Sequence, residues 1–328
     1  MPGSAGRIKA QQEIQAMRIL IVGAGAIGGY FGGRLLEAGR QVTFLVRPGR
    51  AQALDRDGLV VRSALGNFHY PAPPYVLANV LGEPYDLILL SCKAFDLEAC
   101  MDAFAPAVGP DTLILSLLNG MAHLERLSER FGAQAVLGGQ CLISVDRDAA
   151  GAILHLNQTH QLSFGELSGA LTPRILRVAE SLADAGFEAN LSQHIVQGMW
   201  DKWCFIATLA AVTASMRAPL CDILSAGGEG LIMKMHGECA SIALAAGHPL
   251  DARVRQRHLQ MLIQAGSTLT ASMLRDIERG SPTEVEQILG DMLARRNALG
   301  VVCGELSVLE FSCTHVRAYE ARRVREHP

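Results

Sequence analysis

The chain has 328 residues, 49% of them hydrophobic, 19% charged, and a formal net charge of −3. This length is enough for a substantial core and two domains, and the charge gives no reason to expect nucleic acid or an anionic membrane as a partner. Eight cysteines without CxxC spacing predict reduced thiols, and neither they nor the ten histidines suggest a metal site.

The first sixteen residues are polar and precede the first apolar run, so residues 1–16 are expected to form a disordered leader or to reflect an alternative start of the chain. No signal peptide is evident. The longest strongly apolar stretch, 203–216, is too short to span a bilayer. We therefore expect a cytoplasmic protein.

The apolar run at 19–22 predicts a buried parallel strand, and the residues after 28 have helical spacing. Between them, Gly23 permits a tight turn, Gly25 lets the backbone approach a pyrophosphate, and Gly28 lets the helix pack on the strand. The helix N-terminus would then face the anion. This pattern predicts dinucleotide binding, with the cofactor lying along Gly23, Ala24, Gly25, Ala26, Ile27 and Gly28.

The second strand, 42–47, favours NADP over NAD. An NAD-selective site carries Asp or Glu at the end of this strand, whereas this chain has Arg47 and, shortly after, Arg50. A guanidinium fits a 2′-phosphate through charge and paired hydrogen bonds. The alternative is that both arginines are solvated loop charges.

The remaining pattern alternates strands and helices up to about residue 193 and is helical afterwards. Strands are expected at 85–93, 111–119 and 135–144, and helices at 96–105, 123–131 and 173–185. Two further short strands, 152–156 and 160–164, are expected to form a hairpin that turns at 157–159. The sequence predicts an α/β protein: a doubly wound Rossmann domain at 17–193 and an all-helical domain at 194–328, with the substrate in the cleft between them.

Hydride transfer to a carbonyl needs a proton donor or cation beside the oxygen. Lys202 opens an apolar helix and could supply it, or could extend to water from the helix start. Asn119 and Lys93 each follow an apolar strand, where functional loops of such sheets lie; they could also be a turn residue and a surface charge. Glu284 ends a Ser281-Pro-Thr-Glu sequence that matches a helix capping box, which would explain it structurally.

Several of these motifs occur in an order that resembles ketopantoate reductases, and the resemblance runs from Met17 to about Gly300. The most specific part is Ser-Met-x-x-Asp followed by Thr-Glu, at 272–284. The other matching segments are 21–33, 91–94, 118–121 and 200–203. The resemblance implies a Rossmann domain, a helical domain like that of 6-phosphogluconate dehydrogenase, and NADPH as cofactor.

The resemblance also implies a role for each matching residue. Lys202 matches the general acid, and Glu284 the glutamate that contacts the reacting oxygen region. Ser272 matches the serine that holds the substrate carboxylate, and Asn119 the asparagine beside the nicotinamide and the lysine. Lys93 and Arg47 match residues that contact NADPH. A residue can both cap a helix and catalyse, so the two interpretations of Glu284 are compatible.

One departure bears on the substrate. Family members carry asparagines four and eight residues after the lysine, and this chain has Ile206 and Ala210 there. The function expected is NADPH-dependent reduction of a 2-oxo acid, 2-dehydropantoate by default, for pantothenate biosynthesis. The alternatives are an oxidoreductase for a less polar 2-oxo or 2-hydroxy acid and a non-catalytic NADP-binding protein. A homodimer through the helical domain is a further possibility that the sequence leaves open.

Overall fold

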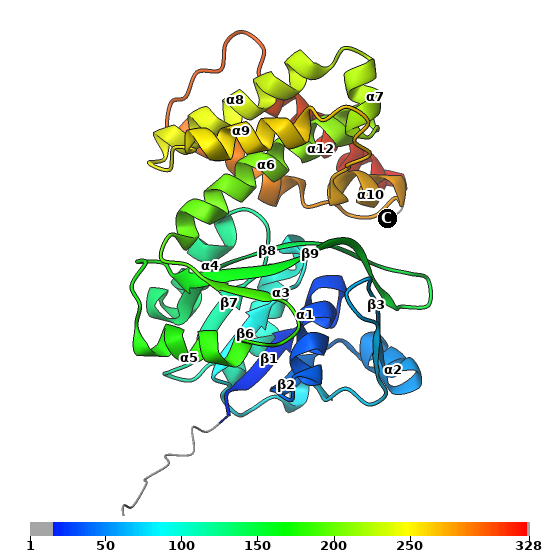
Figure 1. Cartoon of the computed structure of the whole chain (residues 1–328), viewed down its shortest axis with the longest axis vertical. Coiled ribbons are helices and arrows are strands. Elements are labelled where there is room, and N and C mark those ends of the chain that lie inside the picture. The colour runs from blue at the N-terminus through cyan, green and yellow to red at the C-terminus, as the bar shows by residue number, and fades with distance from the viewer. Residues whose placement is uncertain (1–15, 327–328) are drawn as a thin grey trace, which may run out of the picture.

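The structure is a computed structural model that describes residues 16–326. The expected leader therefore lies, but for Ala16, outside the described residues. A sheet-containing half comes first in the chain and a helical half follows, stacked above it in Figure 1.

A ten-stranded mixed sheet forms the first half, in the order β4-β3-β9-β8-β7-β6-β1-β2-β5, with β10 pairing β9. The pairs β3–β4 and β8–β9 are antiparallel and the others parallel. The strands are β1 (Arg18–Val22), β2 (Gln41–Leu45), β3 (Leu59–Arg62), β4 (Phe68–Tyr70), β5 (Tyr75–Val76), β6 (Leu87–Leu90), β7 (Leu113–Ser116), β8 (Val136–Arg147), β9 (Ile153–Glu166) and β10 (Glu188–Leu191).

Helices accompany these strands in the alternation that the sequence predicts. They are α1 (Ala26–Glu37), α2 (Pro48–Asp57), α3 (Leu97–Phe104), α4 (Ala122–Phe131) and α5 (Pro173–Leu182). The central strands β1, β6 and β7 are almost wholly buried, as expected for parallel strands covered on both faces.

The prediction of a hairpin at 152–164 is wrong, because the expected turn at 157–159 does not form. Strand β9 runs unbroken through 157–159 and pairs with β8, so the chain reverses before Ile153. The register between β8 and β9 shifts at Ile143/Val145, and there Asn157 Oδ1 accepts a hydrogen bond from Ser144 N at 3.0 Å. The polar residues that suggested a turn lie opposite this irregularity, where the ladder is locally interrupted.

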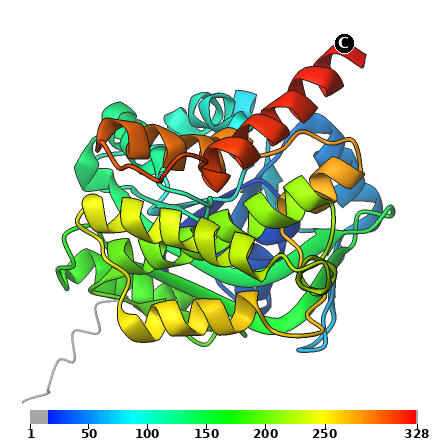
Figure 2. The ribbon, with the colours of Figure 1, turned by 90° about the horizontal axis from the view of Figure 1, so that it is seen from above.

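The second half is helical, as predicted. It contains α6 (Ile195–Met216), α7 (Leu220–Ser225), α8 (Glu229–Ala245), α9 (Ala252–Leu262), α10 (Ser272–Glu278), a π-helical turn η5 (Glu286–Gly290), α11 (Asp291–Ala298) and α12 (Val308–Glu326). Seen from above, α8 lies between α9 on one side and α11 and α12 on the other (Figure 2). The predicted fold class, an α/β domain with parallel strands followed by an all-helical domain, is confirmed.

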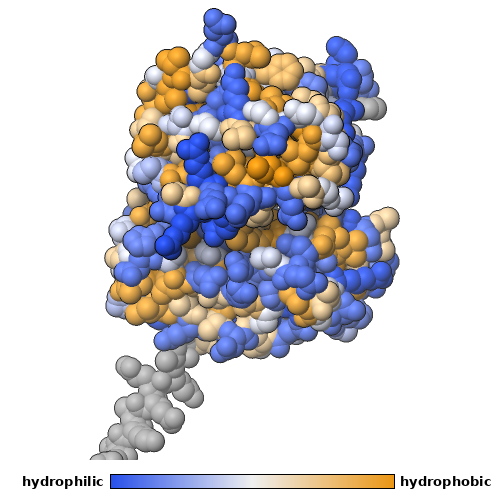
Figure 3. Space-filling view, turned by 45° about the horizontal axis from the view of Figure 1, so that its top comes forward, coloured by the Kyte–Doolittle hydropathy of each residue, from blue (hydrophilic) through white to orange (hydrophobic). Residues whose placement is uncertain are grey.

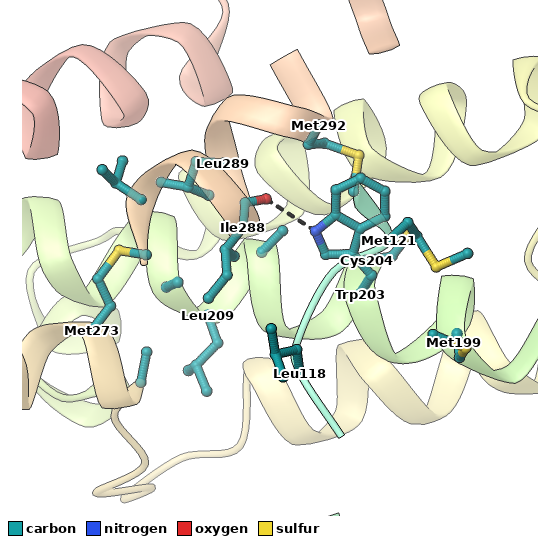
Figure 4. Close-up of a cluster of buried hydrophobic side chains, with 14 of the residues drawn as sticks. Leu118, Met121, Met199, Trp203, Cys204, Leu209, Met273, Ile288, Leu289 and Met292 are labelled. Carbon is teal, nitrogen blue, oxygen red and sulfur yellow. Dashed lines mark hydrogen bonds between the residues drawn. The ribbon is translucent and has the colours of Figure 1, made fainter. Parts of the chain in front are cut away.

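The apolar core continues from the sheet into the helical half. Side chains of β1, β6 and β7 belong to the same buried cluster as those of α6, α8 and α12. Figure 4 shows part of this cluster: Leu118 and Met121, from the loop after β7, lie beside Trp203 of α6. The Trp203 indole N–H donates to the Ile288 carbonyl in η5 at 3.0 Å.

The cysteines and the length of the apolar helices can be checked over residues 16–326. The eight cysteines are all unpaired, as expected, and Cys141, Cys204, Cys239 and Cys313 are buried. None of the helices in this range combines the length and apolar character needed to cross a membrane.

Replacing Trp203 by Phe should destabilise the protein by about 2–4 kcal/mol. The change removes buried ring atoms and leaves the Ile288 carbonyl unpaired, and each effect costs about 1–2 kcal/mol. The measurement is urea unfolding followed by circular dichroism. Trp200→Phe is the matched control, because Trp200 is as deeply buried, 3% exposed, but its ring stacks on His248 instead. Equal losses in the two variants would contradict a contribution from the hydrogen bond.

Candidate functional site

A cavity of about 910 Å³ opens between the two halves of the molecule. Its walls come from the carboxyl ends of the parallel strands, from the start of α1 and from α10. On the face drawn in Figure 3, hydrophilic residues gather in a band between the two halves. Ligands of open α/β sheets bind at this edge, where the strand order reverses. Here β1 separates β2 from β6, so the cavity lies at that reversal.

The glycine turn after β1 forms one wall of the cavity. Gly23 has φ of +96°, a conformation that other residues rarely adopt. A Cβ on Gly28 would overlap the Ser91 hydroxyl and the Gly23 carbonyl, whereas a Cβ on Gly25 would meet nothing within 4 Å. The first and third glycines therefore serve the turn and the packing, and the second leaves open space.

The start of helix α1 faces that space. Gly25 is its N-cap, and the helix has no side-chain cap, so its first N–H groups are available to a ligand. Gly23, Ala24, Gly25, Ala26 and Ile27 line the cavity, and Gly28 packs beneath. This arrangement suits a phosphate group.

Three arginines stand around the far end of the cavity. Arg47 pairs with Asp96 at 2.8 Å, while Arg50 donates from Nε to the Ala24 carbonyl at 2.9 Å. Burial, together with the charge of Arg147, lowers the pKa of Arg50. Arg147 was missed by the sequence interpretation, because the strand expected at 135–144 stops three residues short of it. As the last residue of β8, Arg147 lies at the same edge of the sheet.

Lys202 and Asn119 come from different halves of the molecule and meet. The Lys202 ammonium donates to Asn119 Oδ1 at 3.0 Å. Asn119 lines the cavity, and Lys202 lies behind it rather than on the wall itself. A half-buried ammonium held by an uncharged amide keeps donors for a further oxygen.

Gln287 of η5 holds the Asn119 turn in place. Its amide donates to the Asn119 carbonyl at 2.9 Å and lies 3.1 Å from His123 Nδ1. Gly120 has φ of +79°, and a Cβ there would lie 2.6 Å from the Gln287 carbonyl. The sequence pattern missed Gln287, because its partner lies 168 residues away.

Glu284 does not cap a helix, so the capping-box interpretation is wrong. The helical turn begins only at Val285, and the Glu284 carboxylate points across the cleft to the other half of the molecule. Its Oε1 accepts from Ala94 N at 2.9 Å, and its Oε2 lies 3.4 Å from Lys93 Nζ. This bond between the two halves replaces the local cap that the sequence suggested.

Lys93 is held by two carboxylates. Besides Glu284 it pairs with Asp276 at 3.0 Å. Burial alone would lower the pKa of Lys93, but the charges of Glu284 and Asp276 outweigh it and raise that pKa. Asp276 received no role from the sequence, although it lies within the Ser-Met-x-x-Asp motif.

Ser272 begins α10 and lines the cavity, together with Lys93, Asn119 and Glu284. The start of α10 lies against α6, since Ala271 N donates to Thr213 Oγ1 at 3.3 Å. Ile206 is half-buried, whereas Ala210 is 1% exposed and belongs to the apolar core. Neither lines the cavity itself.

Comparison with known proteins places this arrangement in a family. The model of ketopantoate reductase PanE/ApbA matches residues 19–169, and that of its C-terminal part matches 194–320. The chain belongs to the ketopantoate reductase family. A Bacillus subtilis relative, "Uncharacterized oxidoreductase YkpB", is 33% identical and aligns over 94% of this chain and all of that protein.

Other members of the family agree with this assignment. A 2-dehydropantoate 2-reductase of Mesorhizobium japonicum is 30% identical over 83% of this chain and 89% of its own. The crystal structure of 2-dehydropantoate 2-reductase from Geobacter metallireducens, 28% identical, superimposes with a TM-score of 0.83 over 92% of this chain and 99% of that one. The chain is therefore an oxidoreductase of this family.

Within residues 16–326 no group of three or more His, Cys, Asp or Glu side chains is arranged to hold a metal ion. Each acidic residue of the cavity wall contacts a cation of the chain; these residues are Asp96, Asp146, Asp276 and Glu284.

His123 should make stability depend on pH. It is fully buried, and this burial, reinforced by the charge of Lys202, lowers its pKa to about 3. Below pH 6.5 the unfolded chain binds a proton that the folded state excludes, so the free energy of unfolding falls as the pH falls. Between pH 6.5 and 4.5 this side chain should account for about 2–3 kcal/mol of that fall.

Urea unfolding at the two pH values tests this. His123→Gln should lose less stability on acidification than the wild type, by about the amount given above. The control is His315→Gln, because His315 is exposed on α12. The same acid loss in wild type and H123Q would contradict the assignment.

Proposed function

We propose that this protein reduces a 2-oxo acid with NADPH, with 2-dehydropantoate as the default substrate and pantoate as the product. The observation that carries the proposal is the Lys202–Asn119 hydrogen bond, at 3.0 Å, beside the cleft that the glycine turn lines. It brings a proton donor from one half of the molecule to the dinucleotide-binding edge of the other. The names of the curated relatives support the reaction class.

The cofactor would lie along Gly23–Gly28, with its pyrophosphate at the start of α1 and its 2′-phosphate among Arg47, Arg50 and Arg147. Nicotinamide, when bound, supplies the hydride. Within residues 16–326 neither Arg50 nor Arg147 has an acidic hydrogen-bond partner, and two such cations favour NADP over NAD at this end. A neighbour of 22% identity, titled D-mandelate dehydrogenase with NADH, has the same fold and a different printed cofactor. The phosphate preference therefore rests on the arginines of this chain.

The side chains would divide the chemistry between them. Lys202 donates a proton to the carbonyl oxygen as charge develops there, and Asn119 holds the ammonium in position. Ser272 holds the substrate carboxylate. Glu284, fixed by Ala94 N and Lys93, orients the hydroxyl that forms.

A second candidate is an oxidoreductase for a less polar 2-oxo or 2-hydroxy acid. The observation that favours it is Ile206, which stands one turn after Lys202 where family members carry an amide. An alkyl group there forgoes a hydrogen bond worth about 0.5–1.5 kcal/mol. Rates in both directions on a panel of apolar and polar acids distinguish the two candidates.

Lys202→Ala should reduce kcat at least 100-fold while leaving the dissociation constant of NADPH within threefold. General acids contribute about 10²–10⁴-fold, and Lys202 does not line the cofactor cleft. Stopped-flow NADPH oxidation gives kcat, and NADPH fluorescence titration gives the affinity. Lys234→Ala, an exposed lysine on α8, is the control. Unchanged turnover in K202A would refute the role.

Arg50→Gln should weaken NADPH binding about 10- to 100-fold and leave NADH binding unchanged. A charged hydrogen bond contributes about 1.5–3 kcal/mol, which corresponds to that range. Both dissociation constants are measured by fluorescence titration. Arg56→Gln is the control, because Arg56 lies on the same helix but pairs with Asp57 at the surface. Equal weakening of both cofactors would mean that Arg50 only supports the turn through Ala24.

A further inference from the structure

Helix α10 presents one polar face to the cavity. Ser272, Arg275, Asp276 and Arg279 all line it, and their spacing of three, four and seven residues places them on the same side of the helix. Two turns of one helix thus bring a hydroxyl, a carboxylate and two guanidinium groups to the cavity.

Four charges around this face neutralise one another in two pairs. Arg279 makes two hydrogen bonds to Asp146, at 3.0 and 2.6 Å. Asp276 pairs with Lys93 at 3.0 Å. Each of these groups already has a partner of opposite charge.

Arg275 is different. Its one ion pair within residues 16–326 is a contact of 4.0 Å from Nε to Asp146 Oδ2, and that carboxylate already binds Arg279. Its side chain is only 28% exposed. A partly desolvated guanidinium without a close partner is costly, and its planar fork fits a carboxylate through two parallel hydrogen bonds.

We propose that Arg275 binds the carboxylate of the 2-oxo acid, together with Ser272 one turn earlier on α10. This inference rests on the proposed function and names its substrate more closely. The substrate is then a 2-oxo acid whose carboxylate lies against α10, between Ser272 and Arg275.

The pyrophosphate of the cofactor is the other anion that this guanidinium could bind. The pyrophosphate already has the uncapped start of α1, whose first N–H groups are free to bind it. Arg275 instead shares its helix face with Ser272. The carboxylate is therefore the better match, and the two anions make different predictions.

Arg275→Gln tests the assignment, because Gln keeps a hydrogen-bond donor and the helix propensity but loses the charge and the fork. KM for a 2-oxo acid such as 2-oxoisovalerate should rise 10- to 100-fold, with kcat changed less than threefold and the NADPH dissociation constant within twofold. KM for the uncharged amide of the same acid should not change. Arg253→Gln, an exposed arginine on α9, controls for net charge.

Arg275→Lys gives a second variant with the charge retained, and its KM should lie between those of the wild type and R275Q. An unchanged KM for the acid in R275Q would overturn the proposal. Weakening of NADPH binding by the same factor would overturn it as well and would assign Arg275 to the pyrophosphate.

Binding of oxalate to the NADP-loaded protein, followed by calorimetry, provides a readout without turnover. If the wild type reduces no 2-oxo acid but binds oxalate, and R275Q binds it at least tenfold more weakly, the proposed function fails while the carboxylate site stands. If both proteins bind oxalate equally, the carboxylate site fails.

Discussion

The geometry of the candidate site depends on an apolar core that runs through both halves of the molecule. Leu118 and Met121 flank the Asn119–Gly120 turn and are 4% and 6% exposed, packed beside Trp203 of α6 (Figure 4). A packed interior resists displacement by even a methyl group. The side chains between Lys202 and the sheet are therefore rigid. Lys202 and Asn119 meet without the help of a mobile loop.

Polar contacts between the two halves add to the apolar core in holding the residues of the candidate site in place. Gln287 of η5 donates a hydrogen bond to the Asn119 carbonyl. Glu284, which precedes η5, accepts a hydrogen bond from Ala94 N in the first half of the molecule. Neutralised pairs occupy most of the charged positions around the cleft, Lys93 with Asp276 and Arg279 with Asp146. The cations left without a close acid then indicate where a ligand supplies the negative charge.

The sequence predicted what depends on local pattern. The glycine turn, the buried parallel strands and the helical second half all follow from short periodicities and were confirmed in the fold. Lys202 and Glu284 were ambiguous from their neighbours alone, and only the order of the motifs along the chain, compared with a known family, predicted a role for each. For Glu284 the local pattern was misleading: a capping box describes what four residues can do by themselves, and here Ala94 offers a better partner.

Contacts distant in the chain were beyond such reasoning. Gln287 and Asn119 are 168 residues apart, and no spacing rule connects them. The role of Arg275 could not be predicted either, because it depends on Asp146, the carboxylate that Arg279 already binds. Likewise the polar stretch at 157–159 suits both a turn and a bulge, and only the pairing of β9 with β8 decides between them.

The π-helical turn at Glu286–Gly290 has a consequence for how the chain can change in length. A π turn holds one more residue than an α turn, and such turns often occur at functional sites. Loss of a single residue here would let the segment relax into an ordinary α-helix and would remove the wide turn on which Gln287 lies. Glu284 and Gln287 could not then both reach across the cleft. We expect family members that share this site to keep the length of this segment constant, while the loop at 300–306 tolerates insertions and deletions.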